Sequence, residues 1–145
     1  MKIMGLLRAD AESEAGAPPS RDLMERMGVF IEEVTKAGVM LATDGLHPSA
    51  KGKRVKLSNG KVTMTDGPFT ESKELISSYA VFQVDTMEEA VMWTTRFLQV
   101  LGRGECELRP IFEASDFPAD VFSPEQAAQE EATRAEMKAN AAKRM

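Results

Sequence analysis

Residues 77–112, SSYAVFQVDTMEEAVMWTTRFLQVLGRGECELRPIF, contain a complete strand–helix–strand pattern. The side chains of residues 77–84 alternate between two faces, which is typical of a β-strand. Thr86 opens a capping box, and two glycines end the helix that follows it. Residues 105–112 form the second strand of the unit, in which Pro110 favours an edge or a strand end. The stretch therefore predicts a β-α-β unit.

The amino-terminal part of the chain predicts a second unit of the same kind. Residues 2–8 form a strand, residues 10–20 a polar loop, and the helix that begins at Arg21 stops before Gly38. Residues 39–43 form the next strand, followed by a turn at Asp44-Gly45. One face of the helix is apolar at helical spacing, with Leu23, Met27, Phe30, Ile31 and Val34.

A β-hairpin separates these two units. Residues 54–57 and 61–65 flank Asn59-Gly60, a dipeptide that accepts the positive φ angles of a type I′ turn. A turn at residues 66–69 and a charged loop then lead into the next strand. The order predicts an α+β fold, a ferredoxin-like split βαβ with an inserted hairpin.

The character of the sequence changes near the carboxyl terminus. We expect an α+β domain over residues 1–117 and a helical extension over residues 118–145. Ser123-Pro124 begins a helix rich in Ala, Glu, Gln, Lys and Arg, with few large apolar residues. Two interpretations stay open for this helix: a surface that packs against a partner, or a solvated tail that frays.

Strand alternation leaves one face of the sheet without a helical cover. That face carries apolar and charged side chains together: Met4, Leu6, Arg8, Tyr79, Val81, Gln83, Glu107, Arg109 and Ile111. Such an apolar surface usually needs a cover, which a second copy related by two-fold symmetry would provide. We therefore expect a homodimer in which the polar side chains line a cleft beside the sheet.

Composition limits the class of protein. The chain has 145 residues and a net charge of −5, which argues against general binding to nucleic acid or to an anionic membrane. Cys106 is the only cysteine, so no intramolecular disulfide forms, as in a reducing compartment. No apolar stretch approaches the roughly 20 residues that cross a bilayer. We expect a cytoplasmic protein without a membrane segment.

The string TDGPFTESKE at residues 65–74 closely resembles the signature of the DGPF group of YCII-related proteins. Further similar pieces are MKIMGLLRAD at 1–10, KAGVMLATDGLHPS at 36–49 and ELRPIFEASDF at 107–117. The resemblance implies a dimeric α+β barrel, a superfamily that includes monooxygenases, isomerases, dehydratases and haem proteins. The fold therefore does not choose a reaction. It also implies a gene neighbourhood with extracytoplasmic-function sigma factors.

The sequence departs from the family pattern in two places. The family commonly has two glycines and an aromatic residue after the Lys-Glu pair, where this chain has Ser77-Ser78-Tyr79. YCII proteins have a His near the start of their first helix, and in them a His–Asp pair has been proposed as catalytic. Here the only His is His47, in a loop, so this pair is not carried over.

Five residues are candidates for a functional site. Asp66 is a candidate general base, or alternatively a residue that caps its own turn. His47 has an unperturbed pKa near neutrality and is a candidate proton shuttle, or alternatively an exposed loop residue. Arg8 and Arg109 are candidates to bind a carboxylate or phosphate, or alternatively to pair with nearby glutamates. Tyr79 completes the predicted ligand-binding set.

The sequence predicts neither a metal site nor a cofactor, because one His and one Cys lie far apart and no phosphate-binding fingerprint occurs. Two functions stay open. The first is a dimeric protein that binds a small polar or anionic molecule, with acid–base catalysis by Asp66 or His47 if it is an enzyme. The second is a regulatory protein that acts beside a sigma factor.

Overall fold

The computed structural model describes the backbone of residues 1–145 and every side chain except that of Ser72. The chain divides into two compact units, Met1–Ile111 and Phe112–Met145. The boundary that the sequence predicts at residue 117 lies further along the chain, and the division into domains stays a prediction.

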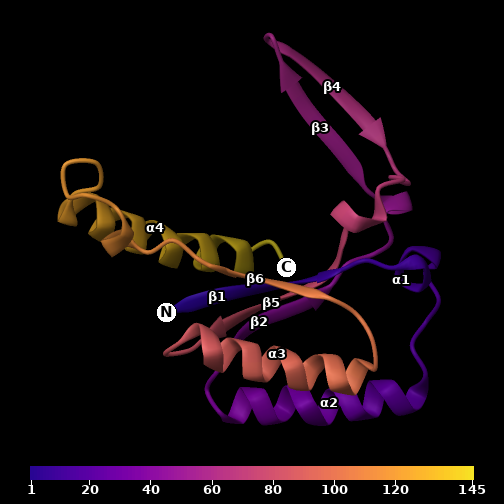
Figure 1. Ribbon diagram of the computed structural model, residues 1–145. Helices are drawn as coiled ribbons and strands as arrows, with labels where there is room; N and C mark the ends of the chain where they lie inside the picture. Colours follow the sequence, from indigo (N-terminus) through magenta and orange to yellow (C-terminus); the bar gives the residue numbers. More distant parts are fainter. The chain divides into compact units, whose positions relative to one another are not determined.

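The first unit contains a four-stranded antiparallel sheet in the order β2-β5-β1-β6 (Figure 1). The strands are β1 (Lys2–Arg8), β2 (Met40–Gly45), β5 (Ile76–Gln83) and β6 (Cys106–Pro110). This is the order of a ferredoxin-like split βαβ, which confirms the predicted α+β fold. Because β6 is an edge strand, Pro110 lies where a missing ladder hydrogen bond costs least, as predicted.

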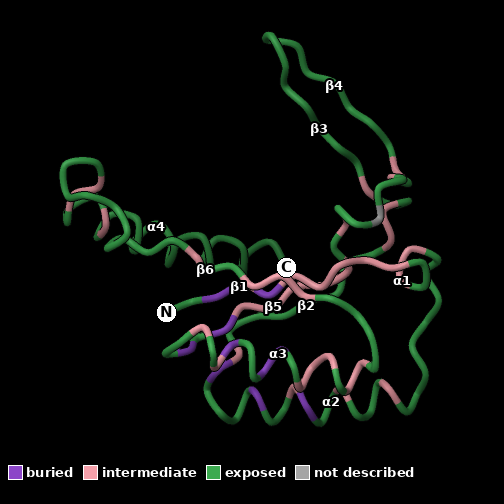
Figure 2. Tube along the Cα trace, in the orientation of Figure 1, coloured by how far each residue is buried: buried purple, intermediate pink, exposed green. Residues whose placement is uncertain are grey.

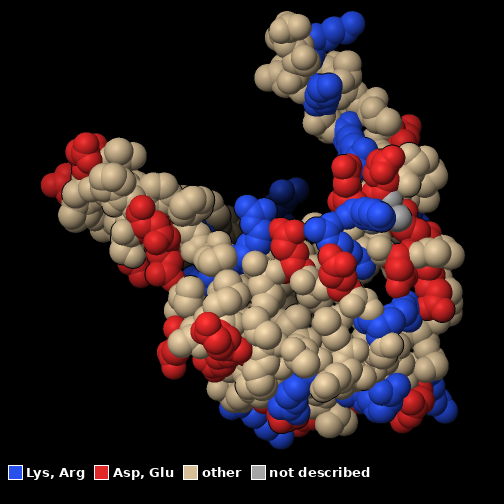
Figure 3. Space-filling view, in the orientation of Figure 1, with Lys and Arg blue, Asp and Glu red and all other residues tan. Residues whose placement is uncertain are grey.

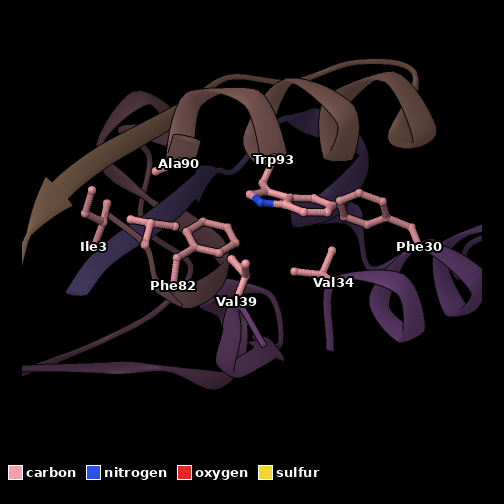
Figure 4. Close-up of a cluster of buried hydrophobic side chains, with 8 residues drawn as sticks. Ile3, Phe30, Val34, Val39, Phe82, Ala90 and Trp93 are labelled. Carbon is pink, nitrogen blue, oxygen red and sulfur yellow. The ribbon is translucent and has the colours of Figure 1, made fainter. Parts of the chain in front are cut away.

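Two helices cover one face of this sheet, α2 (Arg21–Lys36) and α3 (Met87–Leu101) (Figure 1). Ser20 caps α2 and Thr86 caps α3, each by accepting the backbone N–H three residues later. Gly102 takes the left-handed conformation that ends α3. The buried core lies between helices and sheet: Ile3, Phe30, Val34, Val39, Phe82, Val84, Ala90 and Trp93 (Figures 2 and 4).

Strand pairing confirms which side chains share the face opposite the helices. Met4 pairs with Val81 and with Arg109, and Leu6 pairs with Tyr79 and Glu107. The pairs place these residues on the surface that the strand alternation predicts, here called the open face.

Two local predictions were wrong. The predicted loop at residues 10–20 contains a short helix, α1 (Ala11–Ala15), because Asp10 and Ser13 form a reciprocal capping box. The predicted turn at Asp44-Gly45 belongs instead to β2, which pairs with β5 as far as Gly45. Pairing with an existing strand outweighs the turn preference of an Asp-Gly dipeptide.

The inserted hairpin consists of β3 (Lys53–Ser58) and β4 (Lys61–Asp66), which form their own two-stranded sheet. Asn59 and Gly60 have φ angles of 51° and 75°, which confirms the predicted turn. The hairpin is exposed along its length (Figure 2). Two short 3-10 helices, η1 (Ser49–Lys51) and η2 (Ser72–Glu74), flank it in the chain.

The second unit contains a 3-10 helix, η3 (Ala114–Asp116), and one long helix, α4 (Pro124–Ala142). Ser123 and Gln126 form a capping box at the start of α4, with Pro124 in the first turn, so the predicted helix start is confirmed. No residue of α4 is buried. Phe117 lies between Phe112 and Phe122, with ring centroids 5.1 Å and 5.9 Å away.

Candidate functional site

A cavity of about 460 Å³ lies where the sheet ends beside α1 and the first turn of α2. Its volume is in the range of pockets that hold small molecules. We call it the end cavity. The lining combines charged residues, hydroxyl groups and a few apolar side chains; among the polar ones are Arg8, Asp10, Glu12, Ser13, Ser20, Ser77, Ser78 and Arg103.

Arg103 is fixed at one side of the end cavity by two carboxylates. Its Nε donates to Asp10 Oδ2 at 2.7 Å, and its Nη1 lies 2.7 Å from Glu12 Oε2. The hydrogen bond from Arg103, together with the backbone N–H of Ser13, lowers the pKa of Asp10 below its usual value. Asp10 is therefore a carboxylate at neutral pH, and it is suited to orient Arg103 rather than to donate a proton.

Arg8 lies at another side, close to Glu107 of β6 and to Glu105, which directly precedes that strand. Its Nη2 donates to Glu107 Oε1 at 3.1 Å, and its Nε lies 3.1 Å from Glu105 Oε1 without hydrogen-bond geometry. Its Nη1 donates to the backbone carbonyl of Lys73. Arg109 approaches the same glutamate, with 3.6 Å between Arg109 Nη1 and Glu107 Oε2. Both arginines thus make the glutamate pairs that the sequence left as the alternative.

The first turn of α2 contributes a different kind of group to the end cavity. Ser20 and Leu23 both line the cavity, and the hydroxyl of Ser20 accepts the N–H of Leu23. The positive end of the helix dipole therefore faces the cavity. A helix start of this kind favours a negatively charged group nearby.

A second, much smaller cavity of about 40 Å³ lies between the sheet and the two helices. Its lining includes Ser78, Thr94 and Cys106 among mainly apolar residues. The hydroxyl oxygen of Thr94 is buried, and among the described side chains it has no hydrogen-bond partner in the protein. Burial raises the pKa of the Cys106 thiol to about 11, and the nearby Glu105 adds to this effect. Cys106 is therefore a poor nucleophile at neutral pH.

Tyr79 lies on the open face and bonds to the neighbouring strand β2. Its hydroxyl donates to Asp44 Oδ2 at 2.8 Å. The carboxylate of Asp44 accepts this bond and repels the phenolate, so the pKa of Tyr79 is raised above its usual value. Tyr79 is thus a hydrogen-bonding group and stays protonated at neutral pH.

The two candidate acid–base residues, Asp66 and His47, lie outside the end cavity. Asp66 is 75% exposed and pairs with Lys53 at 2.5 Å across the base of the hairpin. His47 is exposed in the loop before Pro48. Within the described part of the chain, no hydrogen bond or ion pair joins these two residues. Their catalytic roles stay predictions.

Comparison with known protein families shows to which family the chain belongs. The model of the YCII-related domain matches residues 1–115. The chain belongs to the YCII-related family. The sequence has no significant match among curated proteins. Among solved structures it is similar to 5-chloro-2-hydroxyhydroquinone dehydrochlorinase (TftG) from Burkholderia phenoliruptrix in complex with 2,5-dihydroxybenzoquinone, at 8% identity. That match covers 81% of this chain and 100% of the other, with a TM-score of 0.43.

The start of α2 lies beside the end cavity. The resemblance implied a His there, where this chain presents Ser20 and Leu23 to the end cavity. Across the described side chains, no three His, Cys, Asp or Glu residues are close enough to hold a metal ion. No helix among the described residues is both long and apolar enough to cross a membrane.

The sequence did not single out two residues of the end cavity, Asp10 and Arg103. Asp10 and Ser13 have the spacing of a helix cap, which could have placed Asp10 at a turn. Arg103 stands between the two glycines that end α3, so its backbone direction depends on the fold. Their meeting joins residues that are 93 positions apart.

Proposed function

We propose that this YCII-related protein binds a small polar or anionic molecule in the end cavity. The observation that carries the proposal is the cavity itself, about 460 Å³ in volume, with Arg8 and Arg103 in its lining. Guanidinium groups bind carboxylates and phosphates with two parallel hydrogen bonds. The amino-terminal turn of α2 adds a further preference for negative charge.

Two of the three glutamates that pair with these arginines, Glu12 and Glu105, are exposed enough for a ligand to replace them, whereas Glu107 is 40% exposed and holds Arg8 in place. The side chains of Glu12 and Glu105 are 68% and 76% exposed. Ion pairs that are this exposed contribute little to stability, so a ligand carboxylate or phosphate can replace either glutamate at small cost. Asp10 is less exposed, at 40%, and keeps Arg103 oriented during this exchange.

If the protein is an enzyme, we propose acid–base catalysis by Asp66 or His47. Neither residue lines the end cavity, so catalysis by either would need a ligand that reaches the base of the hairpin. The cavity therefore favours binding as the primary function, and acid–base catalysis is secondary to it.

Thermal unfolding in the presence of inorganic phosphate tests the proposed site. A ligand that binds only the folded protein stabilises it by about 1.4 kcal/mol at ten times its dissociation constant. We expect phosphate, compared with chloride at equal ionic strength, to raise the unfolding temperature of the wild type. Arg103→Gln should abolish this rise.

Arg26→Gln is the matched control, because Arg26 also pairs with a carboxylate, Asp22, but does not line the end cavity. It should keep the response to phosphate. An equal response in all three proteins would contradict the site. If phosphate has no effect, titration with succinate and citrate extends the test to carboxylates, and no response to any of them would contradict the proposal.

We also propose that the protein is a homodimer that pairs through the open face. Met4, Leu6 and Val81 provide apolar contact area on that face, among charged residues such as Glu107 and Arg109. A two-fold axis would let each open face cover the other. Light scattering at micromolar concentration tests this, and a monomer there would contradict it.

A second candidate function uses the carboxyl-terminal unit. The helix α4 has no buried residue, and all of its residues except Ala127 are exposed, so most of its surface is available to a regulatory partner such as a sigma factor. Removal of residues 123–145 should then abolish binding to purified sigma factor and leave the response to phosphate unchanged. Binding that survives this deletion would contradict a role of α4.

A further inference from the structure

The hairpin of residues 53–66, here called the arm, has two chemically different faces. Val55 pairs with Met64 and Leu57 pairs with Val62, so these four side chains share one face. They are 69%, 70%, 71% and 60% exposed, in that order. The opposite face is polar and basic, with Arg54, Lys56, Ser58, Lys61, Thr63 and Thr65.

The base of the arm is held firmly by the loop of residues 66–69, the DGPF motif. The N–H of Gly67 donates to the carbonyl of Gly52 at 3.0 Å. The N–H of Phe69 donates to Ser49 Oγ at 3.0 Å, and that hydroxyl donates to Glu14 of α1. The ring of Phe69 lies 4.0 Å from the guanidinium carbon of Arg54. The motif thus fixes the position of the arm relative to the rest of the first unit, here called the body.

The arm has no packing partner along its length within the described part of the chain. Its two strands form a separate sheet and pair only with each other (Figure 1). An isolated two-stranded hairpin is marginally stable in water. Four large apolar side chains on one exposed face therefore indicate a surface that is covered when the protein functions.

The distribution of charge favours a second copy as the partner. Residues 53–66 contain four basic residues and one acidic residue, and basic side chains are prominent on the arm in Figure 3. The rest of the first unit, residues 1–52 and 67–111, contains 10 basic and 15 acidic residues. The body of another copy is thus opposite in charge to the arm, which promotes their encounter.

We propose that the arm is a dimerisation element, whose apolar face packs against the body of a second copy. This inference rests on the proposed homodimer and adds a second contact to the open-face contact. Two-fold symmetry makes the contact reciprocal, so eight apolar side chains from two arms are covered together. The DGPF motif then holds the base of the arm in position for contact with the partner; we call its contacts with Ser49, Gly52 and Glu14 the mount of the arm.

The test is the dimer dissociation constant of the full-length protein, measured by sedimentation. The variant Val55→Thr/Leu57→Thr/Val62→Thr/Met64→Thr places a β-branched residue, which favours strands, at all four positions but removes the apolar face. We expect the wild type to be a dimer. The dimer dissociation constant of the variant should be higher than that of the wild type by about a hundredfold or more. The control Thr63→Ser/Thr65→Ser, on the opposite face, should match the wild type.

A photocrosslinking measurement keeps the test decisive if the fourfold variant does not fold. The photoreactive residue p-benzoylphenylalanine is placed at residue 62 on the apolar face, or at residue 63 on the basic face. We expect covalent dimers from residue 62 and few from residue 63. Equal crosslinking from both positions would overturn the proposal.

The outcomes separate this inference from the proposed function. A fourfold variant that dimerises as tightly as the wild type overturns the arm contact but leaves the homodimer intact. A monomeric wild type overturns both, and leaves the phosphate test of the end cavity unaffected. A monomer that sediments with phosphatidylserine vesicles through Val55, Leu57, Val62 and Met64 overturns the proposal in favour of a membrane partner.

Discussion

Gly67 lies directly against the backbone carbonyl of Ser49. A Cβ atom at residue 67 would stand 1.7 Å from that oxygen and 2.6 Å from the carbonyl carbon. No side chain fits there without a shift of backbone, because such distances are far inside van der Waals contact. The glycine of the DGPF motif is thus required by packing, and it joins the end of the arm to the 3-10 helix η1.

Replacement of Gly67 should therefore weaken the base of the arm. We expect Gly67→Ala to lower the free energy of unfolding by roughly 1–3 kcal/mol, as overpacking does elsewhere. Urea denaturation measures the loss, and hydrogen exchange should show it first in residues 53–66. Gly45→Ala is the control, because a Cβ there meets nothing within 4 Å. Equal stability of the two variants would rule out the contact.

The hydrogen bonds between Glu14 and Ser49 should make stability depend on pH. The hydroxyl and the N–H of Ser49 both donate to the carboxylate, which lowers the pKa of Glu14 below its ordinary value of 4.5. A carboxyl group with a lowered pKa stabilises the fold above pH 4.5, and this contribution is lost as the pH falls through the folded value.

Glu14→Gln should accordingly be less stable than the wild type at pH 7, and the difference should shrink as the pH falls below 4.5. Urea midpoints from pH 7 to pH 3 measure it. A difference that stays constant over this range would show that the ionised carboxylate contributes nothing. Glu125→Gln, in the first turn of α4, is a control that removes an acid without a hydrogen bond to Ser49.

Tyr79 is the only tyrosine in the chain, so its ionisation can be followed by ultraviolet absorbance. We expect a pKa above the ordinary value of 10.0, because Asp44 accepts the hydroxyl proton and repels the phenolate. Asp44→Asn should lower the pKa toward 10.0, whereas Asp66→Asn should leave it unchanged. A wild-type titration at the ordinary value would contradict the bond.

Cys106, the only cysteine, should react slowly with thiol reagents in the folded protein. With a pKa of about 11 instead of 9.0, its thiolate fraction at pH 8 falls by about a hundredfold. The rate of reaction with 5,5′-dithiobis(2-nitrobenzoate) should drop accordingly compared with guanidinium-unfolded protein. Equal rates in both states would show that Cys106 is exposed and unperturbed.

The sequence predicted the positions of the candidate site residues in the sheet better than it predicted their contacts. Strand alternation placed Arg8, Tyr79 and Arg109 on the open face. Pairing in the sheet agrees for Tyr79 and Arg109, because the period of two fixes the side of each residue, whereas the register shifts between Leu7 and Arg8. The sequence did not show that Arg8 and Arg109 share Glu107. Such pairs depend on which strands are neighbours, and that order is not local information.

Local physics decided the elements of this protein. The helices follow from apolar spacing and from caps at Ser20, Thr86 and Ser123, and the hairpin turn follows from Asn59-Gly60. These features act within a few residues, so the sequence alone determines them. Even the short helix at residues 11–15 has its signal in the spacing of Asp10 and Ser13.

Tertiary structure alone decided what these elements form together. The end cavity needs Asp10 and Arg103 to meet across 93 positions of the chain, and the mount of the arm needs Glu14, Ser49 and Phe69 in one place. Contacts between distant residues are set by the strand order and by the packing of the helices on the sheet. The sequence pattern does not give the distances between residues that are far apart in the chain. The end cavity and the mount of the arm could therefore be identified only in the folded protein.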